Sequence, residues 1–396
     1  MLLRFLFAVW FLFLNLGQFS AISKGSFGGL YLFDFFAFLF VFAAIIYFLI
    51  STKSKIVFPK TFLSLLGFLF FALISLVIAS QNYLQIEFLY SSFYWLRFFL
   101  YILAGILIYS CFKEGLFSRE FILGLVSLSA LFISIAGFIQ LVILPDFTVL
   151  DSSLGWDPHK NRLASTFFDP NFTGAYLVLC LNFLTAGREF LGKKFVPLVL
   201  LIVFSILLTF SRSAWLMLAV SVFIWGVFKY RLLLILSFFI AFSAYFAVPR
   251  VQTRISGITD PADSAHFRLI SWSKTMEISK DNLLFGTGFN TFRFAQKDYG
   301  FFGVDWGGHS GGGSDSSLLL VLATTGIPGL LLFLSFFGNN IFKAFKNISE
   351  EWSLVLITSF FGLLLESFFI NSLFYPQILF LWVLIGVLFQ FNLYRR

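Results

Sequence analysis

The chain has 396 residues, of which 59% are hydrophobic and only 12% are charged, and its formal net charge is +8. A hydrophobic fraction this large exceeds what a soluble core requires and excludes the soluble globular classes, so lipid surrounds most of the chain. The positive charge would suit nucleic acid, but the basic residues are scattered over loops and form no continuous stripe. We therefore expect membrane lipids, and no nucleic acid, among the partners.

Apolar stretches of about 20 residues recur from end to end, which predicts an all-α integral membrane protein with about twelve transmembrane helices. The whole of 1–396 then forms a single polytopic membrane domain. Breaks rich in Lys and Arg alternate with breaks that are poor in them, and by the positive-inside rule the basic breaks face the cytoplasm together with both termini. The basic breaks lie around 53–60, 113–119, 188–194, 229–231, 343–346 and 395–396.

The first long polar segment, 144–172, is rich in Asp, Pro and Ser, and we expect it to form an external loop because such a composition is not stable in hydrocarbon. It ends where the next span begins, and Asp169 or Asn171 is suited to cap that helix. Capping does not explain the cation Arg162. This residue binds an anion, or it pairs with Asp157 or Asp169.

The apolar run from Phe195 to Phe228 is too long for one span and is interrupted by the sequence TFSRSAW at 209–215. We predict two helices joined by a tight external turn that carries Arg212. An arginine at membrane depth costs about 2.5 to 3.5 kcal/mol on insertion scales, so it usually has a partner or a function. We favour a ligand role over snorkelling for Arg212, since a guanidinium suits bidentate phosphate binding. For Arg97 we favour snorkelling.

The second long polar segment, 249–317, is the predicted large external and catalytic loop. Within it Phe267, Ile270 and Ile278 recur at helical spacing, which predicts a short amphipathic helix on the membrane face. Arg268 opens this predicted helix. A cation near a helix N-terminus opposes the macrodipole, so an anionic ligand is a reasonable alternative explanation for Arg268.

Glycines punctuate the rest of this loop. The DNLLFGTGF turn at 281–289 resembles a dinucleotide fingerprint only superficially, because it lacks the third glycine and a preceding strand. The glycine-rich stretch 307–317 indicates a mobile flap or a close approach of backbone to a ligand. Asp315 either caps the next helix or has a catalytic role, and His309 is either a general base or a solvated side chain.

Several motifs taken together resemble the O-antigen ligase and O-antigen polymerase superfamily of bacterial envelope enzymes. They are the TFSRSAW turn, the FRLISWSKTMEI helix with DNLLFGTGF after it, the SDSSLLLVLATTGIPGLLLF span and the RLASTFFDPNFTGAYL stretch. The resemblance covers roughly Arg162 to Leu334, and the first half of the chain contributes only helices to it.

The resemblance implies a GT-C-like fold and a metal-independent, inverting glycosyltransferase of the bacterial cytoplasmic membrane, with its active site on the periplasmic face and no cofactor. The implied donor is a glycan on undecaprenyl diphosphate, and the implied acceptor is a sugar hydroxyl of lipid A core or of another glycan. The arginines that act on the donor diphosphate in the family fall by motif on Arg212 and Arg268, and Arg162 is a third candidate. The family's catalytic histidine falls on Asp315, so either Asp315 is the base or His309 swings in from the glycine flap.

The alternative from another class is a multispan transporter or flippase of lipid-linked sugars. Such a protein is expected to carry ionisable residues near the bilayer midplane. Here only Glu366 and Asp34 are candidates, and the polar residues concentrate in the predicted external loops. The sequence also contains no HExxH or DxD-like ligand cluster, so we expect no metal site.

Overall fold

The computed structural model describes residues 1–396 except 26–27, 53, 151–157, 258–263, 302–312 and 394–396. The described part is a bundle of helices, which confirms the all-α class, with one small antiparallel hairpin of β1 (Ala21–Gly25) and β2 (Gly28–Tyr31). The α-helices are α1 (Leu2–Leu16), α2 (Leu32–Ile50), α3 (Leu63–Ala79), α4 (Gln85–Lys113), α5 (Arg119–Ile143), α6 (Pro170–Thr185), α7 (Arg188–Leu191), α8 (Phe195–Leu208), α9 (Arg212–Phe228), α10 (Arg231–Ala247), α11 (Pro249–Ser256), α12 (Ser264–Asp281), α13 (Phe292–Asp298), α14 (Ser317–Lys346), α15 (Glu351–Glu366) and α16 (Pro376–Leu393). Short 3-10 turns are η1 (Gly17–Ser20), η2 (Lys60–Phe62), η3 (Ser80–Asn82), η4 (Phe147–Val149), η6 (Ser165–Phe167) and η7 (Gly192–Lys194).

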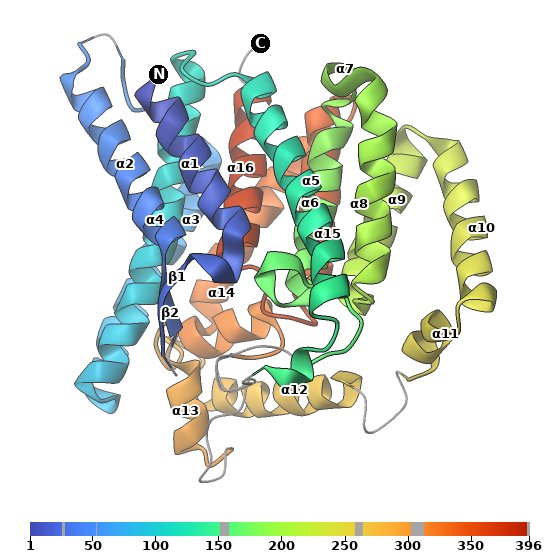
Figure 1. The fold of residues 1–396 in the computed structure, drawn as a ribbon. Coiled ribbons are helices and arrows are strands. Elements are labelled where there is room, and N and C mark those ends of the chain that lie inside the picture. The colour runs from blue at the N-terminus through green and yellow to red at the C-terminus, as the bar shows by residue number, and fades with distance from the viewer. Residues whose placement is uncertain (26–27, 53, 151–157, 258–263, 302–312, 394–396) are drawn as a thin grey trace.

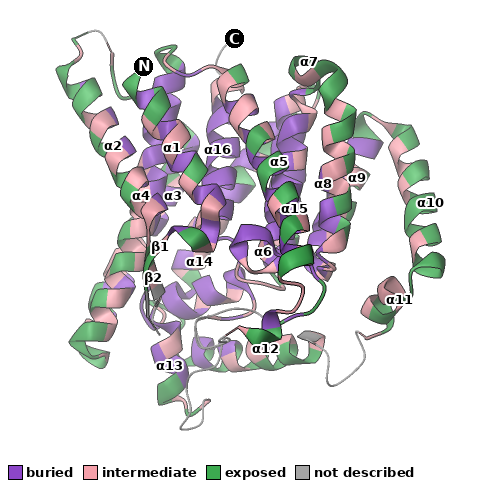
Figure 2. Ribbon diagram, viewed as in Figure 1, coloured by how far each residue is buried: buried purple, intermediate pink, exposed green. Residues whose placement is uncertain are grey.

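The bundle is built around α16, which is apolar on every side and therefore needs neighbours on every side. It packs against α4, α6 and α15, and Figure 2 shows the buried residues concentrated on these central helices. At the edge, α10 has no buried residue and packs on α9 (Figure 1). The apolar side chains of α10 face outward, as expected of a helix in lipid.

Among the described residues, eight helical segments are long and apolar enough to cross a membrane, and a ninth is added if α10 and α11 count as one bent span. The bundle helices α6, α9 and α15 have 16 or 17 residues, fewer than the ~20 that usually cross a bilayer. A multi-pass membrane protein is thus confirmed, whereas the number of about twelve spans stays a prediction.

The two ends of the bundle differ. Both termini and α7 lie at one end, and α11, α12 and α13 lie at the other (Figure 1). Basic residues at the end with the termini bind neighbouring loops. Arg4 Nε donates to Leu116 O in the α4–α5 loop at 2.6 Å, and Arg188 Nη1 donates to Tyr230 Oη in the α9–α10 loop at 2.8 Å. The short basic loops therefore gather at the end with the termini, whereas the long segment 249–317, which carries arginines of its own, lies at the other end; the positive-inside rule counts the short loops.

Arg97 does not snorkel, and that prediction is wrong. Its Nε and Nη2 donate to the two carboxylate oxygens of Asp34 at 2.8 and 2.6 Å, and Nη2 also donates to Gly29 O at 2.8 Å. Asp34 is fixed in turn by accepting from Tyr31 N at the start of α2. A carboxylate partner one helix away holds the guanidinium inside the protein, which makes snorkelling unnecessary.

The glycine turn at 281–289 serves packing. α14 is broken at Gly326, where φ is 67°, and the turn docks on this break. Thr287 N donates to Ala323 O and Ile327 N donates to Leu283 O, both at 2.8 Å. A Cβ on Gly326 would lie 2.5 Å from Leu283 O, so the docked backbones leave no room for a side chain.

Candidate functional site

The α8–α9 turn was predicted correctly: α8 ends at Leu208 and Arg212 is the first residue of α9. Ser211 caps α9, since its Oγ accepts from Ala214 N at 3.4 Å. The partly buried Arg212 donates from Nη1 to Arg254 O at 3.2 Å. A cap and one backbone contact thus fix Arg212 at the end of the bundle that carries α11 and α12.

Arg162 lies beside this turn and is only 8% exposed. Its Nε donates to Thr209 O at 2.8 Å, and its Nη2 donates to Asn171 Oδ1 at 3.2 Å. Ser211 Oγ donates to the same Asn171 oxygen at 2.7 Å. Asn171 therefore joins the first polar loop to Ser211, the residue that precedes Arg212, and Arg162 lies beside the turn that carries Arg212.

Asp169 is the helix cap that the sequence indicated. Its Oδ1 accepts from Asn171 N at 2.7 Å and from Phe172 N at 3.3 Å, and Pro170 occupies the first turn of α6. Carboxylates suit this position because they satisfy helix N–H groups and favour the positive end of the dipole. Asp157, the other partner proposed for Arg162, lies outside the described residues.

The segment that follows Arg162 is buried against neighbouring helices. Gln140 Oε1 accepts from Ala164 N at 2.9 Å and from Ser165 N at 3.3 Å, and Thr166 Oγ1 donates to Asn15 O at 2.6 Å. Side chains of neighbouring helices thus satisfy backbone groups that would otherwise be costly to bury. These hydrogen bonds hold the backbone that follows Arg162 in place.

His159 lies in the same loop and is 6% exposed. Burial, followed by the charges of Arg162, Arg250 and Arg254, lowers the pKa of His159 to about 3. Its ring packs on Phe147, with 4.3 Å between ring centres. The imidazole is therefore neutral at physiological pH, in the middle of several cations.

We name Arg162, Arg212, Arg250 and Arg254 the arginine cluster. The sequence singled out the first two and missed Arg250 and Arg254. A signal for them exists in PRVQTR at 249–254, where a proline starts a helix and two arginines follow at a spacing of four, which places them on one face.

The predicted amphipathic segment is a helix, α12, which runs across the end of the bundle and packs on α14 (Figure 1). Ile278 is buried, but Phe267 and Ile270 are 59% and 40% exposed. The helix begins at Ser264, so Arg268 does not open it and lies in its second turn. The macrodipole argument for Arg268 was therefore wrong, because the dipole acts mainly on the first turn.

Glu366 ends α15 near Arg268. It lies within electrostatic reach of Arg268 and Asp169, and its side chain is fully buried. Ser372 Oγ donates to Glu366 Oε2, while Oε1 has no hydrogen-bond partner among the described residues. Arg268 is thus brought to the same end of the bundle as the cap of α6.

Asp315 does not cap α14. Ser316 does, since its Oγ accepts from Leu319 N at 3.3 Å. Asp315 instead docks on α12: its N–H donates to Ser271 Oγ at 3.0 Å, and its carbonyl oxygen accepts from Trp272 Nε1 at 3.5 Å. The cap prediction was wrong because the serine one position later takes that role.

His309 and the rest of the glycine-rich stretch up to residue 312 lie outside the described residues. Within the described part of the chain, no group of three or more His, Cys, Asp or Glu side chains has the arrangement of a metal site.

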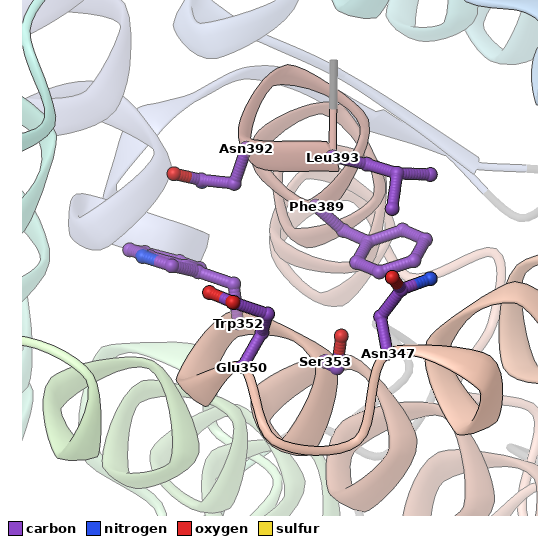
Figure 3. A pocket seen from close by; sticks show the side chains of 7 residues that line it. All are labelled: Asn347, Glu350, Trp352, Ser353, Phe389, Asn392 and Leu393. Atoms are coloured by element: carbon purple, nitrogen blue, oxygen red, sulfur yellow. The ribbon is translucent and has the colours of Figure 1, made fainter. Parts of the chain in front are cut away.

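A small pocket lies between the α14–α15 turn and the end of α16, away from the arginine cluster (Figure 3). Its volume of about 30 Å³ has room for roughly one water molecule. The lining residues are Asn347, Glu350, Trp352, Ser353, Phe389, Asn392 and Leu393. This pocket is too small for a sugar or a lipid headgroup, so it is not the candidate site.

The fold thus defines a multi-pass helical membrane protein whose longest polar segments lie at one end. Residues 197–334 match the family model for O-antigen ligase, which extends from α8 into the first part of α14. This match confirms the resemblance to the O-antigen ligase and polymerase superfamily that the sequence indicated. The matched segment contains Arg212, Arg268 and Asp315 and supports a glycosyltransferase-like enzyme. A search of curated proteins gives no match.

Proposed function

We propose that the protein is an O-antigen ligase-like inverting glycosyltransferase. It transfers or polymerises a glycan carried on undecaprenyl diphosphate, and the acceptor is a hydroxyl of lipid A core or of another glycan. The observation that carries this proposal is the position of Arg162 beside the turn that carries Arg212. Arg162 and Ser211, the residue before Arg212, both donate to Asn171, and Arg212 lies inside the matched family segment. Guanidinium groups held in this way suit a diphosphate.

In the proposed reaction the acceptor oxygen attacks the anomeric carbon, and the bond from this carbon to the phosphate oxygen breaks. The diphosphate leaves with the electron pair, and Arg162, Arg212 and Arg268 offset the negative charge that develops on it. Asp315 takes the proton of the attacking hydroxyl, and His309 is the alternative base. In-line attack inverts the anomeric centre, and arginines that supply the positive charge make a divalent metal unnecessary.

We place the reaction on the periplasmic or extracellular face of the bacterial cytoplasmic membrane, with 144–172 and 249–317 as the external loops. The separation of the basic loops from α11, α12 and α13 supports this orientation (Figure 1).

A transporter of lipid-linked sugars receives less support. Of the two acidic candidates for a transport path, Asp34 forms an ion pair with Arg97, and Glu366 lies at the end of α15 near Arg268. Transport sites usually lie near the bilayer midplane. The placement of these carboxylates therefore favours an enzyme.

The test is a transfer assay with purified protein reconstituted in liposomes, an undecaprenyl diphosphate oligosaccharide as the donor, and EDTA throughout. One reaction contains lipid A core and the other contains donor alone. A product on lipid A core identifies a ligase, and a ladder from donor alone identifies a polymerase. Absence of product in both reactions, with donor movement across the liposome membrane, would contradict the proposal and indicate transport.

A further inference from the structure

α11 is anchored to the first polar loop by Arg250. α10 and α11 meet at 96°, and neither helix has a buried residue, so little packing holds α11 in place. Arg250 supplies the contacts instead: its Nη1 and Nη2 donate to Asn161 O and Lys160 O, at 2.6 Å each. Its guanidinium lies 4.0 Å from the centre of the Phe210 ring. The start of α11 is thereby fixed against both the loop and the α8–α9 turn.

Arg254 follows Arg250 by one helical turn and lies on the same face of α11. Its backbone oxygen accepts from Arg212, so α11 and the start of α9 lie side by side. Arg254 also lies within electrostatic reach of His159, as Arg162 and Arg250 do. Several arginines around one partly buried place create a positive electrostatic potential there, which attracts an anionic ligand.

His159 supplies the second and independent observation. Its ring is almost fully buried, and neither ring nitrogen has a hydrogen-bond partner among the described residues. Buried polar atoms are normally paired, and a neutral imidazole has one N–H donor and one acceptor nitrogen. Such a ring among cations is suited to donate one hydrogen bond to an anionic ligand.

From this geometry we infer that Arg254 is a further phosphate-binding residue, which acts with Arg212 on the same ligand while His159 donates a neutral hydrogen bond. The ligand class is the diphosphate of the lipid-linked donor. This inference rests on the proposed function and adds to it a binding residue on α11, which Arg250 anchors.

The test measures binding, not turnover. Undecaprenyl diphosphate without a glycan is titrated into the purified full chain in phosphatidylcholine nanodiscs, with undecaprenyl monophosphate and phosphatidylglycerol as comparison ligands. Arg254→Ala and Arg254→Gln should each weaken binding of the diphosphate at least tenfold, and Arg254→Lys should recover part of the loss because it keeps the charge. Arg231→Ala, at the opposite end of α10, should leave binding unchanged and is the matched control.

Two results would overturn the inference. If both neutral Arg254 variants bind undecaprenyl diphosphate within twofold of wild type while Arg212→Ala does not, Arg254 is no ligand and the proposed function stands. If the variants lose phosphatidylglycerol to the same extent, the site holds lipid headgroups in general and the diphosphate assignment is wrong. Failure of the wild-type protein itself to prefer undecaprenyl diphosphate would contradict the proposed function.

Discussion

The pKa of the His159 imidazole reflects its burial and the arginines around it. The pKa of its imidazole is about 3 in the folded protein and close to 6.5 in an unfolded chain. Between these values the unfolded chain binds the proton and the folded protein does not. Stability is therefore lost as the pH falls below about 6.5, and the loss continues down to about 3.

We predict that lowering the pH from 7 to 5 costs the wild-type protein on the order of 2 kcal/mol through His159 alone. The measurement is the thermal unfolding midpoint of the detergent-solubilised protein at both pH values. His159→Gln should show a smaller decrease on acidification, whereas the exposed His266 offers a control, since His266→Gln should behave as wild type does. An equal decrease in the wild-type and His159→Gln proteins would show that the ring does not resist protonation.

The second prediction at this scale concerns the base. Asp315→Asn should lower the transfer rate by about 10² to 10⁴-fold with unchanged binding of undecaprenyl diphosphate, because the amide does not accept the proton. His309→Gln is the companion variant and should retain most of the activity. The reverse pattern, an active Asp315→Asn and an inactive His309→Gln, would assign the proton transfer to the histidine.

At the scale of elements, the 281–289 turn packs so closely on α14 that two glycines there have no room for a side chain. Gly286 has a φ of 67°, as Gly326 does, and a Cβ on it would lie 2.2 Å from the Thr324 carbonyl carbon. The turn follows α12 directly, so this junction holds the C-terminal end of α12 against α14. Helix docking therefore explains the glycines of the 281–289 motif.

We predict that Gly326→Ala destabilises the protein by about 1 to 3 kcal/mol from the left-handed backbone conformation, in addition to the clash. Gly338→Ala in the same helix is the control, because its Cβ meets nothing within 4 Å. Thermal unfolding of both purified variants compares them. Equal midpoints for Gly326→Ala and wild type would show that α14 is not held at this break.

The sequence predicted the α8–α9 hairpin from length, and it predicted a helix at α12. The amphipathic character expected of α12 was wrong, because its apolar residues do not gather on one face and Phe267 and Ile270 are exposed. It failed where a partner distant in sequence decides. Asp34, 63 residues away, holds Arg97 in a partly buried ion pair, so Arg97 does not snorkel. The external placement of 144–172 stays a prediction, but composition did not reveal that Gln140 and Asn15 hold the chain after Arg162 against the bundle. Tertiary contacts of this kind are not visible to a local pattern.

For the whole molecule, the separation of basic loops from the candidate site predicts sidedness. Cysteine substituted at Lys280, on α12, should react with a membrane-impermeant maleimide in intact spheroplasts, and cysteine at Lys193 should react only after permeabilisation. Both lysines are exposed, whereas the natural Cys111 and Cys180 are buried and give little background. Labelling of both positions from the same side would contradict the orientation.

The family match covers 197–334, and the contacts described above extend the candidate site beyond it on both sides, to Arg162 in the first polar loop and to Glu366 on α15. Four parts of the chain thus meet at one end of the bundle: the first polar loop, the start of α9, α12 and the end of α15. The central claim is that Arg162, Arg212 and Arg268, from the first three of these parts, bind the diphosphate of the donor.

The most direct test is glycan transfer by Arg212→Ala and Arg268→Ala in the reconstituted assay, with Arg231→Ala as the control and membrane insertion verified for each variant. We predict that both alanine variants lose transfer completely while they insert as the wild-type protein does, and that Arg231→Ala remains active. Transfer at the wild-type rate by either alanine variant would show that this arginine does not act on the diphosphate, and the claim would be wrong.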